Sequence, residues 1–193
     1  MKIVSFYSNE RQLIKKAIAG NRSAQKTIYE RFSPKMLSVC RQYIKDIHFA
    51  EDVMVNGFVK VFKNLEAFEH RGSFEGWVRK IMVRESISYL RKSQFVVYDD
   101  ALFEANAAQQ LEETSIVDVE HIQQLIDALP EGYKMVFVLY AVEGYKHHEI
   151  ATMLDISEGT SKSQLFKARK MLQENLRLKG LMSGQNNNKK NHG

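Results

Sequence analysis

The segment 147–170 places short hydrogen-bonding side chains and cations in a regular order on two consecutive helical patterns. Ile150 and Leu154 give the first pattern an apolar inward face, and Asp155 follows where the chain must turn. Ser157 then stands where its hydroxyl can cap the second helix. Two short helices joined by a tight turn are typical of a helix-turn-helix, which places its second helix in the major groove of DNA.

The second of these helices carries two kinds of side chain that suit DNA. Hydroxyl and amide groups near its start can exchange hydrogen bonds with base edges, and cations farther along can neutralise phosphates. The alternative is an amphipathic hairpin with a solvated basic face. The joint presence of the turn, the cap and the polar-then-basic order favours DNA binding. The predicted DNA-binding residues are Ser157, Glu158, Thr160, Ser161, Lys162, Ser163, Gln164, Lys167, Arg169 and Lys170.

A metal-dependent hydrolase is a rival interpretation, prompted by His147, His148 and Glu149. The zinc motif that contains a His-Glu pair needs a second histidine three residues after the glutamate, and Thr152 stands there instead. The sequence also lacks a glycine-rich phosphate loop and a glycine-flanked serine nucleophile. We therefore expect no catalytic residue, no metal site, no cofactor and no small-molecule substrate.

The first half of the chain shows helical periodicity and no sustained alternation of the strand type. Pro34 is expected to open a separate helix, and Glu51 and Asp52 are expected in the first turn of the next one, where the helix dipole favours carboxylates. Gly57 is either a close packing point or a small defect. The predicted helices cover residues 10–19, 49–65 and 77–92, with a further one that starts near Ser23.

Charge is unevenly distributed along the chain. Residues 1–93 contain 18 Lys and Arg against 9 Asp and Glu, whereas residues 94–120 contain 7 acids and no base. Residues 121–193 return to a basic balance, with 10 bases against 7 acids. The pattern predicts two basic helical domains that are joined by an acidic linker, and both domains suit a polyanionic partner.

The compartment can also be predicted. No apolar run reaches the 18 or so residues that a membrane helix needs, and the first residues lack the apolar core of a signal peptide. Cys40 is the single cysteine, so no intrachain disulfide can form, and its apolar neighbours indicate a core position. We expect a cytoplasmic protein.

Two independent groups of motifs resemble the extracytoplasmic-function (ECF) family of RNA polymerase sigma factors. The group similar to region 4 of that family is Leu129-Pro130-Glu131-Gly132-Tyr133, Val138-Leu139-Tyr140, Gly144-Tyr145, His148-Glu149-Ile150-Ala151 and Glu158-Gly159-Thr160-Ser161-Lys162-Ser163. The group similar to region 2 is Ala50-Glu51-Asp52-Val53, Phe58-Val59-Lys60-Val61-Phe62, Leu65-Glu66-Ala67-Phe68, Arg71-Gly72-Ser73-Phe74-Glu75-Gly76-Trp77-Val78-Arg79-Lys80-Ile81 and Tyr89-Leu90-Arg91-Lys92. Both groups stand in the order that the family has.

The resemblance implies an all-α protein of two small helical domains joined by a flexible acidic linker. The implied domains are a region 2 bundle over 10–93, the linker over 94–120, a helix-turn-helix region 4 over 121–178, and a disordered tail over 179–193. Region 2 binds core polymerase and melts the minus-ten element, and region 4 reads the minus-thirty-five element. The implied function is promoter recognition and transcription initiation without catalysis.

The resemblance also assigns residues to these roles. In the second region, polymerase binding falls to Glu51, Asp52, Asn56 and Phe58. Minus-ten recognition falls to His70, Arg71, Ser73, Phe74, Arg79, Lys80, Arg84, Arg91 and Lys92. An extruded base needs an aromatic or apolar pocket and hydrogen bonds, and the cations hold the strand's phosphates. Trp77 is interpreted as core because its helix is so apolar.

The implied partners are core RNA polymerase, through its clamp helices and flap, promoter DNA, and an anti-sigma factor. Asn56-Gly57 departs from the family pattern, which has a glutamine followed by an acid there. A stand-alone helix-turn-helix regulator and a helical adaptor without a DNA role are the remaining alternatives. Binding to core polymerase separates the family prediction from both.

Overall fold

A computed structural model describes residues 3–97 and 119–187, and every element within these ranges is helical. The all-α prediction is confirmed. The described helices form two compact units, α1 to α4 and α5 to α8. The predicted linker mostly lies outside the described residues, but its first four residues, 94–97, continue α4, and 119–120 begin α5.

The first unit begins with α1, Ile3–Ile18, and α2, Arg22–Tyr43. Gly20, with a φ of +80°, ends the first helix as predicted, and the Asn21 side chain caps the second by accepting from the Ala24 amide at 2.9 Å. Pro34 lies inside α2 and opens no helix of its own, so that prediction was wrong. A proline in a helix interior removes one backbone hydrogen bond, and the burial of α2 on both sides of it compensates.

The third helix, α3, spans Ile47–Lys63 and starts earlier than predicted. Its cap is Asp46, whose carboxylate accepts from the amides of His48 and Phe49 at 2.8 and 3.2 Å. Glu51 and Asp52 therefore lie in the second turn, and the prediction that they occupy the first turn was wrong. Both carboxylates are solvent-exposed there.

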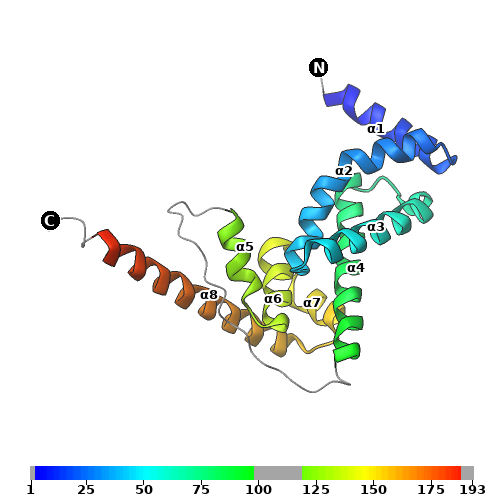
Figure 1. Ribbon diagram of the computed structural model, residues 1–193. Helices are drawn as coiled ribbons and strands as arrows, with labels where there is room; N and C mark the ends of the chain where they lie inside the picture. Colours follow the sequence, from blue (N-terminus) through cyan, green and yellow to red (C-terminus); the bar gives the residue numbers. More distant parts are fainter. Residues whose placement is uncertain (1–2, 98–118, 188–193) are drawn as a thin grey trace. The chain divides into compact units, whose positions relative to one another are not determined.

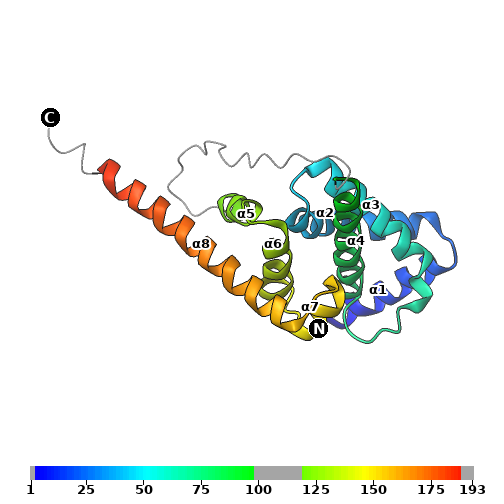
Figure 2. The same ribbon diagram turned by 90° about the horizontal axis from the view of Figure 1, so that it is seen from below.

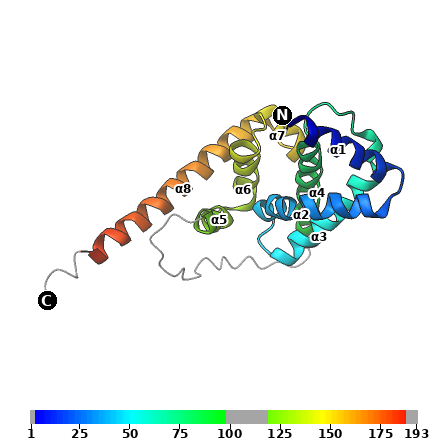
Figure 3. The same ribbon diagram turned by 90° about the horizontal axis from the view of Figure 1, so that it is seen from above.

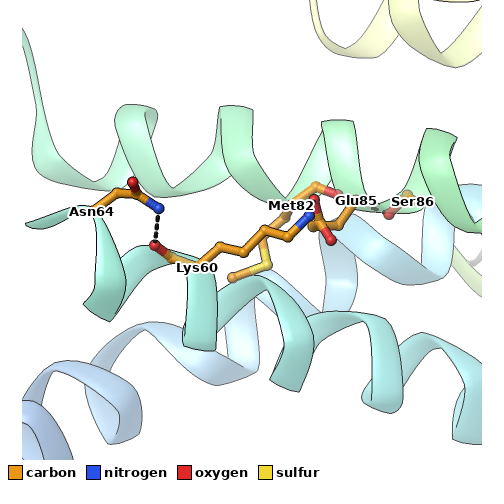
Figure 4. A network of polar contacts seen from close by, with 5 residues as sticks. All are labelled: Lys60, Asn64, Met82, Glu85 and Ser86. Carbon is orange, nitrogen blue, oxygen red and sulfur yellow. Dashed lines mark hydrogen bonds and ion pairs between the residues drawn. The ribbon is translucent and has the colours of Figure 1, made fainter. Parts of the chain in front are cut away.

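A short 3₁₀ turn, η1 (Leu65–Ala67), leads through a loop into α4, Phe74–Val97, which packs against α2 and α3 (Figure 1). Figure 4 shows the Met82 side chain lying between α3 and α4, and Lys60 reaching from α3 to the Glu85 carboxylate on α4. An ideal Cβ on Gly57 would come too close to Met82, so Gly57 is a close packing point between the two helices. The largest fully buried side chains of this unit are Ile14, Ile28, Met36, Phe58, Leu65, Phe74 and Met82.

The second unit contains α5 (Val119–Asp127), α6 (Glu131–Phe137), a π-helical segment η2 (Val138–Val142), α7 (His147–Leu154) and α8 (Glu158–Asn187). The first half of α8 packs against α6 and α7, and its second half extends past them, as Figures 2 and 3 show. The helix continues nine residues beyond the predicted domain end at residue 178, so residues 179–187 of the expected tail are helical; residues 188–193 lie outside the described ranges.

A buried ion pair links α5 to α6 across the turn at Pro130. The Lys134 ammonium bonds the Asp127 carboxylate at 2.5 Å, and the two side chains are 7% and 5% exposed. Gln123 donates a second hydrogen bond to the same carboxylate oxygen at 3.2 Å. A buried pair of charges needs such additional partners, because both ions have left water.

Membrane insertion has no candidate among the helices of residues 3–97 and 119–187, since none of them is long and apolar enough to cross a bilayer. Within the same ranges, no group of three or more His, Cys, Asp or Glu side chains is placed to hold a metal ion.

Candidate nucleic-acid interface

The turn between α7 and α8 has the geometry that the sequence predicts. Asp155 adopts the left-handed conformation, with φ and ψ of 57° and 49°, and ends α7. The Ile156 amide donates to the Ala151 carbonyl at 3.0 Å, which closes the turn. Ser157 caps α8, because its hydroxyl accepts from the Thr160 amide at 2.9 Å. The predicted turn and cap are confirmed.

The two faces of α8 differ sharply in burial. Leu165 and Ala168 are 5% and 0% exposed and pack inward toward Ile150 of α7, which is itself fully buried. The opposite face is open to solvent and carries most of the predicted DNA-binding cations. The exposed side chains on this face are Lys162, Ser163, Phe166, Lys167, Arg169 and Lys170.

Phe166 was not predicted from the sequence, and it is 70% exposed among these cations. An exposed ring of this size offers apolar area that a partner could bury, and phenylalanine can contact the methyl group of thymine in the major groove. Its position one residue after the inward-facing Leu165 is the signal that could have identified it, because adjacent helical residues differ by 100° in direction.

The start of α8 holds the remaining predicted residues in varied surroundings. Thr160 accepts or donates a hydrogen bond with Ser157 at 2.9 Å, and Glu158 pairs with Lys162 at 3.7 Å on the surface. Gln164 is half-buried beside Gly132 of α6. These side chains line the edge of the basic face.

Ser161 was expected to face DNA, and the structure contradicts that expectation. The residue is 0% exposed, and its hydroxyl lies 2.9 Å from Nδ1 of His147. Ser161 precedes Leu165 by one helical turn, so both residues lie on the inward face of α8. Its role in this conformation is to join α8 to α7.

Two aromatic residues outside the predicted set lie under the cations of α8. The Arg169 guanidinium sits 5.5 Å from the ring centroid of Tyr140, and the Lys167 ammonium sits 5.8 Å from that of Tyr133. Tyr140 also stacks on His147, with centroids 4.7 Å apart and an angle of 25° between the planes. These contacts hold two cations of α8 against aromatic rings of α6 and η2.

In the first unit, the loop between η1 and α4 has an unusual backbone. His70 has a φ of +56°, which a residue with a side chain rarely adopts, and Gly72 has a φ of +97°. The His70 ring lies edge-on to Phe68 with centroids 4.7 Å apart. Ser73 ends the loop by accepting from the Gly76 amide at 3.1 Å, which caps α4. The loop therefore presents an exposed His70 at a fixed place.

Beyond this loop, α4 presents cations to solvent. Lys80, Arg84, Arg91 and Lys92 of the helix are exposed, as is Arg71 in the preceding loop. Arg79 is half-buried. Lys80, Arg84 and Arg91 are separated by four and seven residues, so they lie on one side of the helix. This distribution of cations suits a phosphate backbone.

Phe74 was expected to contact an extruded base, but it is 1% exposed. Its ring packs against Phe32, Phe68 and Trp77, with centroid distances of 5.5, 5.2 and 5.8 Å. This aromatic cluster supports the loop from beneath, so Phe74 is a core residue and that prediction was wrong. Trp77 is half-buried in the same cluster, consistent with the expected core role.

The exposed face of α3 combines acids with apolar groups. Glu51, Asp52 and Asn56 are exposed, and between them Val55 and Val59 are 46% and 45% exposed. Phe58, by contrast, is 2% exposed, with its ring centroid 4.8 Å from that of Tyr29. The prediction that Phe58 contacts polymerase was therefore wrong: it is part of the core that holds α3 in place.

An open cavity of about 370 Å³ lies between α1, α2 and the start of α4. Two ion pairs cross its wall, Arg31 with Glu10 at 3.8 Å and Lys35 with Glu75 at 2.7 Å. Because each cation there has a carboxylate partner, the cavity carries no excess charge of either sign.

Two family profiles match the chain. The profile described as Sigma-70 region 2 matches residues 28–96, and the one described as Sigma-70, region 4 matches residues 120–172. The chain is 28% identical over 177 residues to the ECF RNA polymerase sigma factor SigW of Bacillus subtilis, which covers 85% of this chain and 95% of that protein. It is 26% identical over 175 residues to the ECF RNA polymerase sigma-E factor of Escherichia coli, covering 83% and 90% of the two chains.

Solved structures show the same fold. The sigma factor RpoE of Bartonella quintana, crystallised in complex with the anti-sigma factor NepR, aligns with a TM-score of 0.53 at 22% identity, over 79% of this chain and 96% of that one. CnrH in complex with the cytosolic domain of CnrY aligns with a TM-score of 0.50 at 19% identity, over 88% and 97%.

Proposed function

Because this chain belongs to the extracytoplasmic-function family of RNA polymerase sigma factors, we propose that its two helical units divide promoter recognition between them. The chain binds core RNA polymerase and directs it to promoters for transcription initiation. The first unit docks on polymerase and holds the opened minus-ten strand, and the second reads the minus-thirty-five element. The exposed basic face of α8, with its inward face packed on α7, is the observation that carries this proposal.

Recognition of the minus-thirty-five element falls to the outward side chains of α8. Lys162, Lys167 and Lys170 bind phosphates as point charges, and Arg169 can form a bidentate contact. Ser163 and Phe166 face the same side and read base edges and thymine methyl groups. Ser157, Glu158, Thr160 and Gln164 border this surface at the helix start. Ser161 supports the surface from inside.

Capture of the opened minus-ten strand falls to the loop before α4 and to the cations of that helix. His70 and Ser73 offer hydrogen bonds to an unpaired base, and Phe68 and Phe74 stiffen the loop beneath them. The exposed cations neutralise the strand's phosphates; they are Arg71, Lys80, Arg84, Arg91 and Lys92, with the half-buried Arg79 beside them. Binding energy alone favours the melted state, and no catalytic step is required.

Docking on core polymerase uses the exposed face of α3. Glu51 and Asp52 meet cations of the clamp helices and set orientation and association rate. Val55 and Val59 add exposed apolar surface that becomes buried on binding. Asn56 lies on the same face, and its amide supplies a hydrogen-bonding group where the family has a glutamine. The second unit contacts the flap.

We extend the proposal to regulation and location. The solved relative from Bartonella quintana is in complex with an anti-sigma factor. A protein of that kind would hold this chain inactive by covering the surfaces that bind polymerase. The chain works in the cytoplasm, where core polymerase and promoter DNA are found. It needs no cofactor, metal or small-molecule substrate.

Run-off transcription with core polymerase and a genomic fragment library tests this function. Wild-type protein is expected to direct discrete start sites, and Lys162→Ala and Arg169→Ala are expected to lower their yield. Arg177→Ala is the matched control, because Arg177 is an exposed cation on α8 about 15 Å beyond Lys167 at 1.5 Å per residue. DNA binding without any polymerase-dependent transcript would refute the proposal in favour of a stand-alone regulator.

A further inference from the structure

Three contacts join two points of α8 through residues of η2 and α7. Arg169 of α8 lies over the Tyr140 ring at 5.5 Å, and Tyr140 stacks on His147 at 4.7 Å. His147 in turn shares a hydrogen bond of 2.9 Å with Ser161, which is again a residue of α8. Ser161 and Arg169 are eight residues apart, or about 12 Å along the helix axis. We name Tyr140 and His147 the aromatic bridge.

A local departure from α-helical geometry places Tyr140 in this bridge. The segment η2 is a π-helix, and the Glu143 amide donates to the Val138 carbonyl five residues earlier at 3.0 Å. Such segments are rare and insert one extra residue into a helical turn, which rotates the following side chains relative to an uninterrupted helix. The Tyr145 amide then donates to the Leu139 carbonyl at 2.9 Å and fixes the loop that leads to His147.

The kind of contact between Arg169 and Tyr140 matters for DNA. A guanidinium held over an aromatic face by a cation–π contact spends no N–H group on the ring, so its donors can still bind a phosphate. A carboxylate partner would instead occupy those donors. The ring therefore restricts the side chain to a narrow set of rotamers without competing for the hydrogen bonds that DNA would use.

The other end of the bridge holds the helix itself. Ser161 is 0% exposed, and a buried hydroxyl without a partner is costly, so its bond to His147 favours one rotation of α8 about its axis. That rotation decides which side chains of α8 face outward. The stacked rings of Tyr140 and His147 therefore help to fix both the rotation of α8 and the position of the Arg169 guanidinium.

We propose that Tyr140 is a positioning residue for promoter recognition: with His147 it holds the Arg169 guanidinium ready for a phosphate of the minus-thirty-five element. This inference rests on the proposed function, since it assumes that α8 faces DNA. Neither residue of the bridge needs to touch DNA for this role. Preorganisation of this kind raises affinity by lowering the conformational entropy that binding removes.

The first test observes the bridge in the full-length protein without DNA. In NMR spectra, the side-chain protons of Arg169 are expected to show an upfield ring-current shift in the wild type and in Tyr140→Phe, and to lose it in Tyr140→Leu. Tyr140→Phe keeps the ring and removes only the hydroxyl, so it is the matched control. Absence of the shift in the wild type would overturn the proposal.

The second test measures affinity for the promoter fragment that gives the strongest run-off product, as a function of salt. Tyr140→Leu is expected to bind about threefold to tenfold more weakly, in the range of one cation–π contact. Its salt slope should stay close to that of the wild type because Arg169 keeps its charge, whereas Arg169→Ala should lower the slope by about one phosphate contact. Tyr140→Phe should match the wild type, and Tyr140→Leu with Arg169→Ala should be no weaker than Arg169→Ala alone.

Additive losses in that double variant, or wild-type affinity in Tyr140→Leu, would refute the positioning role. Thermal unfolding by circular dichroism checks that Tyr140→Leu is folded, and Ser161→Ala tests the other end of the bridge by the same measurements. The failure of the proposed function looks different: then the wild type itself directs no transcript from any fragment. A transcript from the wild type with unaltered DNA binding by Tyr140→Leu rejects the bridge alone.

Discussion

An ideal Cβ on Gly57 would stand 2.3 Å from the Sδ atom of Met82 and 2.9 Å from its Cε atom, so α3 and α4 approach each other through a missing side chain. Met82 is 0% exposed, and its thioether must move within a packed core to admit a methyl group. We expect Gly57→Ala to lower the free energy of unfolding by about 1–3 kcal/mol, the usual cost of overpacking. Trp77 is the only tryptophan, so its fluorescence in urea reports the unfolding of this unit.

In a Met82→Ala background, the effect of Gly57→Ala on stability is expected to change sign. Met82→Ala removes the atoms that the new methyl group would meet and leaves a cavity. In that background Gly57→Ala is expected to be neutral or to stabilise by up to about 1 kcal/mol, the difference in helix propensity between glycine and alanine. Equal losses in both backgrounds would show that the close contact is not the cause.

The sequence predicted the helical class, most helix positions and the turn before α8, because these depend on local signals. Asp155 and Ser157 satisfy backbone requirements that any helix-turn-helix shares. Pro34 misled the prediction, since a proline usually marks a helix start but the apolar face of α2 continues across it. The cap at Asp46 was not predicted, because the expected helix began at residue 49 with Glu51 and Asp52 in its first turn.

The burial of individual site residues was predicted less well, although part of the signal was present. Phe58 shares the helical spacing of buried Met54 and Val61, and that periodicity outweighed the family resemblance. Ser161 precedes the inward-facing Leu165 by one turn and could have been placed inside by the same argument. The aromatic bridge was not predictable, because Tyr140 depends on a π-helical turn that an ideal helical pattern does not contain.

The buried pair of Asp127 and Lys134 supplies a prediction for the second unit. Asp127→Asn removes one charge and leaves the Lys134 ammonium buried without its carboxylate. We expect the free energy of unfolding of this unit to fall by about 3–5 kcal/mol, whereas an Asp127→Leu, Lys134→Met double variant should recover most of the loss. Circular dichroism detects the change, and the Trp77 fluorescence transition, which reports the first unit, should stay unaltered.

Cys40 supplies a prediction about pH. Burial raises the pKa of its thiol to about 11 from the ordinary 9.0; the Ser86 hydroxyl lowers it and the Glu85 carboxylate raises it by smaller amounts. Because the pKa is higher in the folded state, the thiol's contribution to stability is complete below pH 9.0 and is lost as pH rises toward 11. The wild type should lose about 2–3 kcal/mol over that interval relative to Cys40→Ala.

Reaction with a thiol reagent provides an independent measurement of the same group. Native protein at neutral pH should react only at the rate at which the first unit opens, and protein in urea should react at once. Rapid labelling of the native protein, with Trp77 fluorescence unchanged, would mean that Cys40 is accessible in the folded chain.

Phe166 provides a prediction that separates DNA reading from stability. The side chain is 70% exposed, so Phe166→Ala should change the free energy of unfolding by less than about 0.5 kcal/mol. Affinity for the promoter fragment that gives the strongest run-off product should nevertheless fall, because we propose that the ring contacts thymine methyl groups of its minus-thirty-five element. Replacement of thymine by uracil in that duplex removes these methyl groups, and it should weaken the wild type while leaving Phe166→Ala unaffected. Equal sensitivity of both proteins to uracil would place the ring away from the bases, and Phe166 would then be free to contact protein instead.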